Sequence, residues 1–559
     1  MFVRCVRNRE GREYLMIMES VWEDGRTRQR VLLNLGRLDA LQATGQLDRI
    51  TAALSRYCTK LKLIDLTKEI SVSGTYVFGS IDVLKKLVER TAIQGILEDL
   101  VDAHPAVAFP LVEAAFSMIA SRFVRPCSKL KLKEHWLDRF YPELLSPDIA
   151  LQHLYRCLDH LEVHKEEIQK KLLYPTSQYS LFETPKLELV FYDTTTLRFE
   201  SIRNEEGSLR RFGYSKERRN DCTQVILGLL LDREGLPVGY RLFPGNTYEG
   251  KTLSPILKQL KDEYHVERLI FVADRGMIRR GNLSDLQEAG FEFIVGMKLW
   301  AMKRKEQRRI TALSSWDSKT PEYKVKELTH PEGRLIVTWS REREKRDQQV
   351  RNDLLQKLKA KLSREDDPAS LISHKGFKRY LKTTKKGKVA INEAAIDQEA
   401  RRDGLFGILT NVPKEKLSAS NILTRYKELW HIEDAFGEIK GTLETRPMFH
   451  WTDRRIEGHM MICFLAYYIE AYVTQQLRKQ GAEFTAPAAF DALNQVRAVP
   501  VTVRNQTVWV RTPIVGIAAK TYQLLKIRIP SDVLRLPPPE KPDEMNFSSS
   551  PKLHAVSTT

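Results

Sequence analysis

The chain has 559 residues, of which 42% are hydrophobic and 29% charged, and its 90 Lys and Arg exceed its 72 Asp and Glu, giving a net charge of +18. This composition is typical of a globular protein. The length predicts about three or four domains. The positive charge favours a polyanionic partner. Six scattered cysteines without a C-x-x-C pair indicate neither a disulfide framework nor a zinc site, and fit a reducing cytoplasm. The sequence begins without the apolar core of a signal peptide. The longest uncharged apolar run, 460–469, is too short to span a bilayer, so no membrane partner is predicted.

The first part of the chain is predicted to contain two different regions. Residues 1–75 are expected to form a small β-rich segment, because short apolar runs alternate with Gly-containing turn signals. Residues 76–185 then show helical periodicity interrupted by prolines. We expect this second region to be a helical DNA-binding domain, although no helix-turn-helix signature is clear.

Residues 186–296 change to an α/β pattern. Apolar strands are predicted at 186–193, 224–231, 238–243, 269–273 and 291–295, with helices near 252–264 and 282–288. The second and third strands form a hairpin. The first strand is expected to end on Asp193 and the fourth on Asp274. This order predicts a mixed sheet.

A basic insertion interrupts the α/β pattern at 297–405. Residues 341–388 carry 16 Lys and Arg against 7 Asp and Glu, a net +9 that is half of the chain's total. Such an excess favours a phosphate-binding surface over an ordinary solvated helix face. Trp300, Trp316 and Trp339 lie in the same insertion, although each alone is more often a core residue than a stacking platform.

The α/β pattern resumes at 406–500 with a strand at 405–411 and a helix at 426–440. On this helix Leu429, Ile432, Phe436, Ile439 and Leu443 form an apolar seam. The adjacent stripe contains Tyr426, Trp430, Glu433, Gly437 and Lys440. A second apolar helix at 459–473 is expected to pack behind it. Residues 501–559 are predicted to be a C-terminal segment with a disordered tail from Leu536.

Three carboxylates from distant parts of the chain are candidate metal ligands. Asp193, Asp274 and Glu433 repel one another when close, so a cation among them would keep them ionised. Carboxylate oxygens suit Mg²⁺ or Mn²⁺. Two such ions about 4 Å apart can activate a water or a 3′-hydroxyl and stabilise the leaving oxygen of a phosphodiester. Together with the basic insertion, this favours phosphodiester cleavage.

The sequence around these acids resembles the DDE transposases of bacterial insertion sequences, and most closely the insertion sequence 4 superfamily with its Tyr-(2)-Arg-(3)-Glu-(6)-Lys signature. The resemblance covers roughly 186–475 and is weaker in the N-terminal β segment. It rests on Tyr192-Asp193-Thr-Thr-Thr, Phe271-Val-Ala-Asp274-Arg-Gly, Tyr426 with Glu433 and Lys440, Gly213-Tyr-Ser-Lys-Glu-Arg, Pro244-Gly-Asn-Thr-Tyr-Glu, Asp403-Gly, Arg446-Pro and Gly458-His.

The resemblance implies an RNase H-like catalytic core in two halves, 186–296 and 406–500, split by the insertion domain 297–405. It implies that Asp193, Asp274 and Glu433 are catalytic and hold Mg²⁺, with Mn²⁺ able to substitute. Tyr426 and Lys440 would then bind the phosphates of the transposon end. Further candidate DNA contacts are Arg275, Lys216 and Trp300, the last by stacking on a flipped base.

The sequence departs from the signature at its arginine position, which is Leu429 here and belongs to the apolar seam. Arg425 or Lys427 are candidate substitutes. The expected protein is a transposase that acts on double-stranded DNA, both transposon ends and target, as a homodimer in a bacterial, nucleoid-associated location. Two alternatives are a domesticated DNA-binding relative that no longer cleaves, and a metal-independent hydrolase in which Asp193 and Glu433 act as the two carboxylates.

Overall fold

The computed structural model contains two compact units. The first unit contains Met1–Gly74 together with Val499–Val510 and the chain from Val533. The second contains Thr75–Ala498 and Arg511–Asp532. The structure describes residues 1–23, 26–55, 57–58, 70–174, 187–199, 207–214, 221–277, 280–311, 316–363, 371, 375–383, 389–445, 448, 450–503 and 506–535. The predicted disordered tail from Leu536 lies outside them.

The first unit begins with the β-rich segment that the sequence predicts. Strands β1 (Phe2–Arg7), β2 (Glu13–Glu23) and β3 (Arg26–Arg37) form an antiparallel sheet in that order. Helices α1 (Leu38–Ala43) and α2 (Gln46–Ser55) follow. In the same unit β4 (Ile70–Val72) pairs with the second half of β17 (Arg497–Val503), and β18 (Gln506–Arg511) pairs with β19 (Val533–Arg535).

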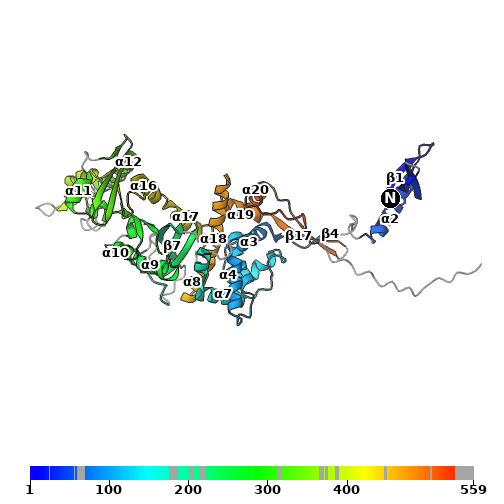
Figure 1. The fold of residues 1–559 in the computed structure, drawn as a ribbon, viewed down its shortest axis with the longest axis horizontal. Helices are drawn as coiled ribbons and strands as arrows, with labels where there is room; N and C mark the ends of the chain where they lie inside the picture. Colours follow the sequence, from blue (N-terminus) through cyan, green and yellow to red (C-terminus); the bar gives the residue numbers. More distant parts are fainter. Residues whose placement is uncertain are drawn as a thin grey trace, which may run out of the picture. The chain divides into compact units, whose positions relative to one another are not determined.

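The second unit begins with the predicted helical region. After β5 (Tyr76–Val77), its helices are α3 (Gly79–Arg90), α4 (Ile93–Ala103), α5 (Leu111–Val124), α6 (Lys129–His135), the 3₁₀ turn η1 (Leu137–Arg139), α7 (Leu151–Val163) and α8 (Lys165–Leu173). Three helices from the end of the chain join this unit, namely α18 (Asp453–Lys479), α19 (Ala486–Asn494) and α20 (Gly516–Leu524). The long helix α18 packs against α5 and α7 and also contacts β8, so it links the helical region to the sheet (Figure 1). Gly458 permits the close contact with α7, because a Cβ atom there would collide with the Leu158 carbonyl oxygen.

A nine-stranded mixed sheet has the order β11-β12-β13-β16-β10-β9-β6-β7-β8. Only the β9–β6 and β9–β10 pairs are parallel. The strands are β6 (Leu189–Arg198), β7 (Gln224–Asp232), β8 (Pro237–Pro244), β9 (Ile270–Ala273), β10 (Glu292–Met297), β11 (Ser318–Lys319), β12 (Tyr323–His330), β13 (Gly333–Ser340) and β16 (Leu405–Thr410). The predicted hairpin and mixed sheet are confirmed.

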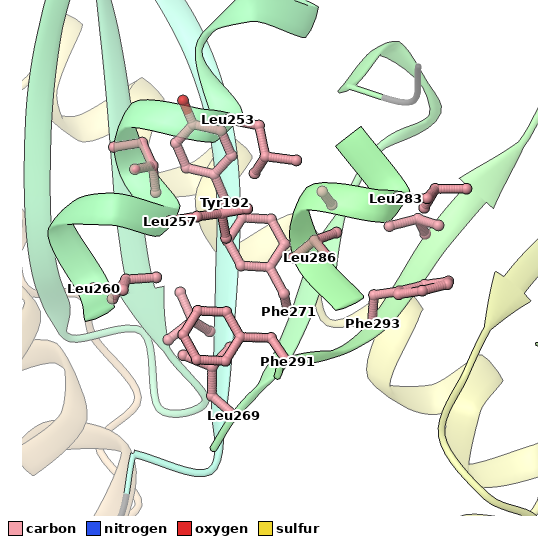
Figure 2. Close-up of a cluster of buried hydrophobic side chains, with 14 of the residues drawn as sticks. Tyr192, Leu253, Leu257, Leu260, Leu269, Phe271, Leu283, Leu286, Phe291 and Phe293 are labelled. Carbon is pink, nitrogen blue, oxygen red and sulfur yellow. The ribbon is translucent and has the colours of Figure 1, made fainter. Parts of the chain in front are cut away.

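One face of this sheet is covered by α9 (Leu253–Lys258), which continues into the π turn η3 (Gln259–Glu263), and by α10 (Arg280–Glu288). Leucines from α9, η3 and α10 pack with Tyr192 of β6 and Phe271 of β9 in one buried cluster (Figure 2). The rings of Tyr192 and Phe271 lie 5.6 Å apart. Because side chains alternate along a strand, the neighbours of Tyr192 and Phe271 point to the opposite face of the sheet.

The insertion contributes strands to the same sheet. Its β12 and β13 form a hairpin, and β13 pairs with β16. Its remaining elements are the 3₁₀ turn η5 (Leu299–Ala301), α11 (Arg304–Thr311), α12 (Arg341–Ser363), α14 (Lys375–Lys378), β14 (Leu381–Thr383), β15 (Val389–Ile391) and α15 (Glu393–Ala400). A small second core of Leu358, Leu371, Phe377 and Tyr380 holds α12 against α14.

Two sequence expectations are wrong. Strand β6 does not end at Asp193, since Thr194 to Arg198 continue the antiparallel pairing with β7. The expected helix 426–440 is two helices, α16 (Ala419–Lys427) and α17 (Trp430–Lys440). Around the joint the backbone bonds shorten to three-residue spacing, from Leu429 N–H to the Tyr426 carbonyl and from Ile432 N–H to the Leu429 carbonyl. This tighter 3₁₀ turn separates α16 from α17, and no longer loop lies between them.

Candidate active site

The register of two parallel strands brings Asp193 and Asp274 side by side. Tyr192 of β6 is the partner of Ala273 of β9, so the residues that follow them occupy adjacent positions on neighbouring strands. Tyr192 and Ala273 belong to the cluster under α9 and α10, and alternation therefore directs both aspartates to the opposite face. Asp274 follows the last residue of β9 and is exposed, whereas Asp193 is half-buried within β6.

Helices α16 and α17 cover the face on which the aspartates lie. Helix α16 contacts β9 and β10, and α17 contacts β6 and β7. Phe191, on the same face of β6 as Asp193, has its ring 6.2 Å from the ring of His431 in α17. Glu433 follows two residues later and is exposed. The buried side of α17 is formed by Ile432, Ala435, Phe436 and Ile439. This apolar side and the contacts with β6 and β7 dock α17 on the sheet that carries both aspartates.

Tyr426 connects α16 directly to one of the aspartates. Its hydroxyl donates a 2.9 Å hydrogen bond to Oδ1 of Asp274. Its ring lies 5.3 Å from the ring of Phe406 on β16. Burial and the neighbouring Asp274 carboxylate raise the pKa of Tyr426 above its ordinary value, so the phenol remains a hydrogen-bond donor at neutral pH. The backbone of β10 approaches this hydroxyl at Gly296, where a Cβ atom would collide with it.

Arginine side chains lie beside this hydrogen bond. Arg275 follows Asp274 directly and is exposed. Arg343, from the first turn of α12, has its guanidinium carbon 4.6 Å from the centre of the Phe406 ring. Burial lowers the pKa of Arg343, Asp347 opposes this effect, and the positive charges of Arg346 and Arg275 add to it. The sequence marks the basic run 341–388 but does not identify Arg343 within it.

The donor set suits a hard divalent cation at the two aspartates. Both provide carboxylate oxygens, and they occupy adjacent in-register positions on one face of the sheet. Glu433 lies on the helix above that face but does not complete the set. In the described part of the chain, no three His, Cys, Asp or Glu side chains are grouped closely enough to hold a metal ion.

The remaining predicted DNA contacts have varied surroundings. Lys440 is half-buried at the end of α17. Trp300 packs against the main buried cluster, and the Arg402 guanidinium lies 4.6 Å from the centre of its ring. The structure does not bring Trp300 into contact with the aspartates, and its stacking on a base remains a prediction. Lys216 lies outside the described residues.

Leu429 and its candidate substitutes lie at the joint between α16 and α17. Leu429 is half-buried, unlike the fully buried apolar residues that follow it on α17. Arg425 donates to both carboxylate oxygens of Glu428, at 3.1 and 3.2 Å. Lys427 is exposed, with its ammonium 6.0 Å from the ring centre of Tyr323.

Comparison with known proteins gives two family matches. Residues 184–469, just over half of the chain, match the transposase DDE domain. Residues 3–66 match the N-terminal domain of IS1634 family transposases. No curated protein matches the chain. Among solved structures, a piggyBac transposase synaptic complex with hairpin DNA is similar with a TM-score of 0.38 and 10% identity, over 75% of this chain and 80% of that chain. Within the described residues, no helix is long and apolar enough to cross a membrane.

Proposed function

The chain belongs to the DDE-domain transposases, enzymes that cleave and transfer DNA with divalent metal ions, and we propose that it binds the terminal inverted repeats of an insertion sequence, cleaves the ends and joins their 3′-hydroxyls to target DNA. The observation that carries this proposal is the in-register pair of Asp193 and Asp274 beneath α16 and α17. The strand and helix order from β6 to β10 supports an RNase H-like core.

We propose that Asp193 and Asp274 hold Mg²⁺, with Mn²⁺ able to substitute, and that Glu433, on the helix above them, joins them as the third ligand when the ion binds. When bound, such ions activate a water or a 3′-hydroxyl and stabilise the leaving oxygen of a phosphodiester. Tyr426 orients one oxygen of Asp274 by its hydrogen bond, so the carboxylate is positioned before DNA arrives. The buried side of α17 keeps Glu433 on the aspartates' face of the sheet.

The Tyr-Arg-Glu-Lys assignment gives further proposed roles to the helix pair. Lys440 would bind a phosphate of the transposon end, as would Arg275 and Lys216. The phosphate contact that the signature assigns to Tyr426 would require its hydroxyl to leave Asp274, because a phenol has one proton to donate. Lys440→Ala should weaken binding to all ends and reduce the slope of log affinity against log salt by about 0.9, the value for one phosphate on duplex DNA. An unchanged slope would remove Lys440 from the DNA contact.

Single substitutions of the three carboxylates test the proposed chemistry. Asp193→Ala, Asp274→Ala and Glu433→Ala should each abolish Mg²⁺-dependent cleavage of labelled DNA from the ends of the element, while binding to these ends is retained. Asp434→Ala is the matched control, because Asp434 is the exposed acid next to Glu433 on α17. Any of the three variants that cleaves at the normal rate is not a metal ligand. Cleavage that survives EDTA would favour the metal-independent hydrolase.

We propose a homodimer in the synaptic complex, because two transposon ends each require an active site. Light scattering should give a mass near one chain per bound end, with two chains when two ends are held together. A complex of one chain with two ends would contradict the dimer.

A further inference from the structure

Arg343 reaches the candidate active site because the insertion is joined to the central sheet. Strand β13 pairs with β16, with Thr338 opposite Phe406 and Trp339 opposite Leu405. Helix α12 starts at Arg341, directly after β13 ends at Ser340. The backbone N–H of Arg343 donates to the Ser340 hydroxyl at 3.3 Å, which fixes the first turn of the helix.

Two aromatic rings lie between the Arg343 guanidinium and Asp274. Its guanidinium lies 4.6 Å from the ring centre of Phe406, and that ring lies 5.3 Å from the ring of Tyr426. The Tyr426 hydroxyl in turn donates to Asp274. A guanidinium stacked on an aromatic face keeps its N–H groups available at its edge, whereas a lysine ammonium has no planar face to stack.

Two arginines, Arg275 and Arg343, lie around Tyr426 together with the carboxylate of Asp274. Arg275 and Arg343 both act electrostatically on the Tyr426 hydroxyl, and they repel each other. Among the described residues, neither arginine has a carboxylate within ion-pair distance. Two guanidinium groups held near each other are stabilised when an anion binds between them, and planar bidentate donors match the oxygens of a phosphate.

We propose that Arg343, supplied by the insertion, acts with Arg275 as a clamp for a backbone phosphate of the DNA strand at the Asp193–Asp274 site. This proposal rests on the transposase function proposed above. The Tyr-Arg-Glu-Lys signature has an arginine at the position of Leu429. Here Arg343 on α12 would supply that positive charge. Arg343 is then a substrate-binding residue, and the basic insertion contributes to the active site itself as well as to a general DNA-binding surface.

The test compares Arg343→Ala and Arg343→Lys with Arg268→Ala, which removes the same charge from an exposed position outside the insertion, before β9 and at the opposite end of that strand from Asp274. The probe is a labelled duplex of the DNA that flanks the coding sequence, bound at several salt concentrations and cleaved under single-turnover conditions. A lost hydrogen bond to a charged phosphate corresponds to roughly a 10- to 100-fold effect. We expect Arg343→Ala to slow cleavage by about that factor and to reduce the salt slope by about 0.9.

The Arg343→Lys variant separates the effect of the positive charge from that of the bidentate hydrogen bonds. Arg343→Lys should keep the salt slope within experimental error of the wild type but still slow cleavage several-fold, because lysine lacks the bidentate donors. Arg268→Ala should cleave at the wild-type rate. If Arg343→Ala matches the wild type in both measurements, or if Arg268→Ala shows the same losses, the clamp is refuted.

The outcome for the clamp is distinguishable from the outcome for the transposase function. If the wild type binds DNA but does not cleave it with Mg²⁺, the proposed function fails, whereas the salt slope of Arg343→Ala still decides the clamp. If the wild type cleaves and Asp274→Ala does not, the function stands whatever Arg343→Ala does. Thermal unfolding of each variant, expected within a few degrees of the wild type, excludes misfolding as the cause of a loss.

Discussion

The hydrogen bond between Tyr426 and Asp274 allows a prediction in which one atom is removed and the surrounding packing remains. Tyr426→Phe deletes the hydroxyl that donates to Asp274 Oδ1 at 2.9 Å. The ring and its contact with Phe406 at 5.3 Å are retained. Asp274 then keeps its place at the end of β9 but loses the donor that orients its carboxylate.

The size of the effect follows from the type of bond. A hydrogen bond to a charged group contributes about 1.5–3 kcal/mol, which corresponds to roughly a 10- to 150-fold change in rate. Asp274 is exposed, so water replaces part of the lost bond. We therefore expect cleavage to slow by about 10- to 30-fold, with DNA binding changed less than about 3-fold.

Single-turnover cleavage of end DNA at saturating Mg²⁺ measures this effect. Tyr323→Phe is a suitable control, because Tyr323 is also half-buried and bonds to Thr338 and not to a carboxylate. Since the pKa of Tyr426 is raised above its ordinary value of 10.0, the phenol should contribute no step to the pH–rate profile below pH 10. Wild-type cleavage by Tyr426→Phe would refute the orienting role, and so would an equal loss in Tyr323→Phe.

Three further predictions concern stability and DNA access. Gly458→Ala should destabilise the fold by about 1–3 kcal/mol in denaturant unfolding, because its Cβ atom would collide with the backbone of α7, whereas Gly95→Ala in α4 meets no atom within 4 Å and should stabilise it by about 0.5–1 kcal/mol. Burial lowers the pKa of Lys129, bonded to His459 at 2.8 Å, from 10.5 to about 7. Between these pH values the unfolded chain binds a proton that the folded chain does not, so stability should rise with pH there and the slope should flatten in Lys129→Met. Gly437→Leu should raise the melting temperature slightly, because the space there is open and leucine favours a helix interior over glycine, but should weaken binding of end DNA if the DNA backbone approaches α17 at this point.

The sequence predicts six of the nine strands of the central sheet, because these are continuous apolar runs bounded by turns, but it does not predict that β11, β12 and β13 of the insertion extend the same sheet. It does not predict how far β6 extends, because Thr194, Thr195 and Thr196 carry polar hydroxyls and follow an acid, a pattern also typical of a turn. Their backbone groups pair with β7, and this long-range pairing determines the strand end. β-branched threonines fit that paired position.

The candidate site is predictable in its residues but not in its geometry. Three acids and a tyrosine are recognisable in the sequence, yet only the register between β6 and β9 makes Asp193 and Asp274 neighbours. Arg343 is one of 16 cations in the run 341–388, and nothing in the local sequence separates it from the others. Its position depends on the pairing of β13 with β16, between segments far apart in the chain.

Because of the joint between α16 and α17, Tyr426 and Glu433 lie on helices that contact different strands of the sheet. In one straight helix, seven positions span about 10.5 Å along the axis, so the distance and the angle between the Tyr426 and Glu433 side chains would be fixed. The turn at Glu428 and Leu429 frees α16 to follow β9 and β10 while α17 follows β6 and β7. Arg425 is bonded to Glu428 across this joint, which leaves it poorly placed as a phosphate ligand. A half-buried leucine at the joint therefore suits the packing of the two helices, and the cation that the signature places there is better supplied from outside the helix pair, where Arg343 lies against Phe406.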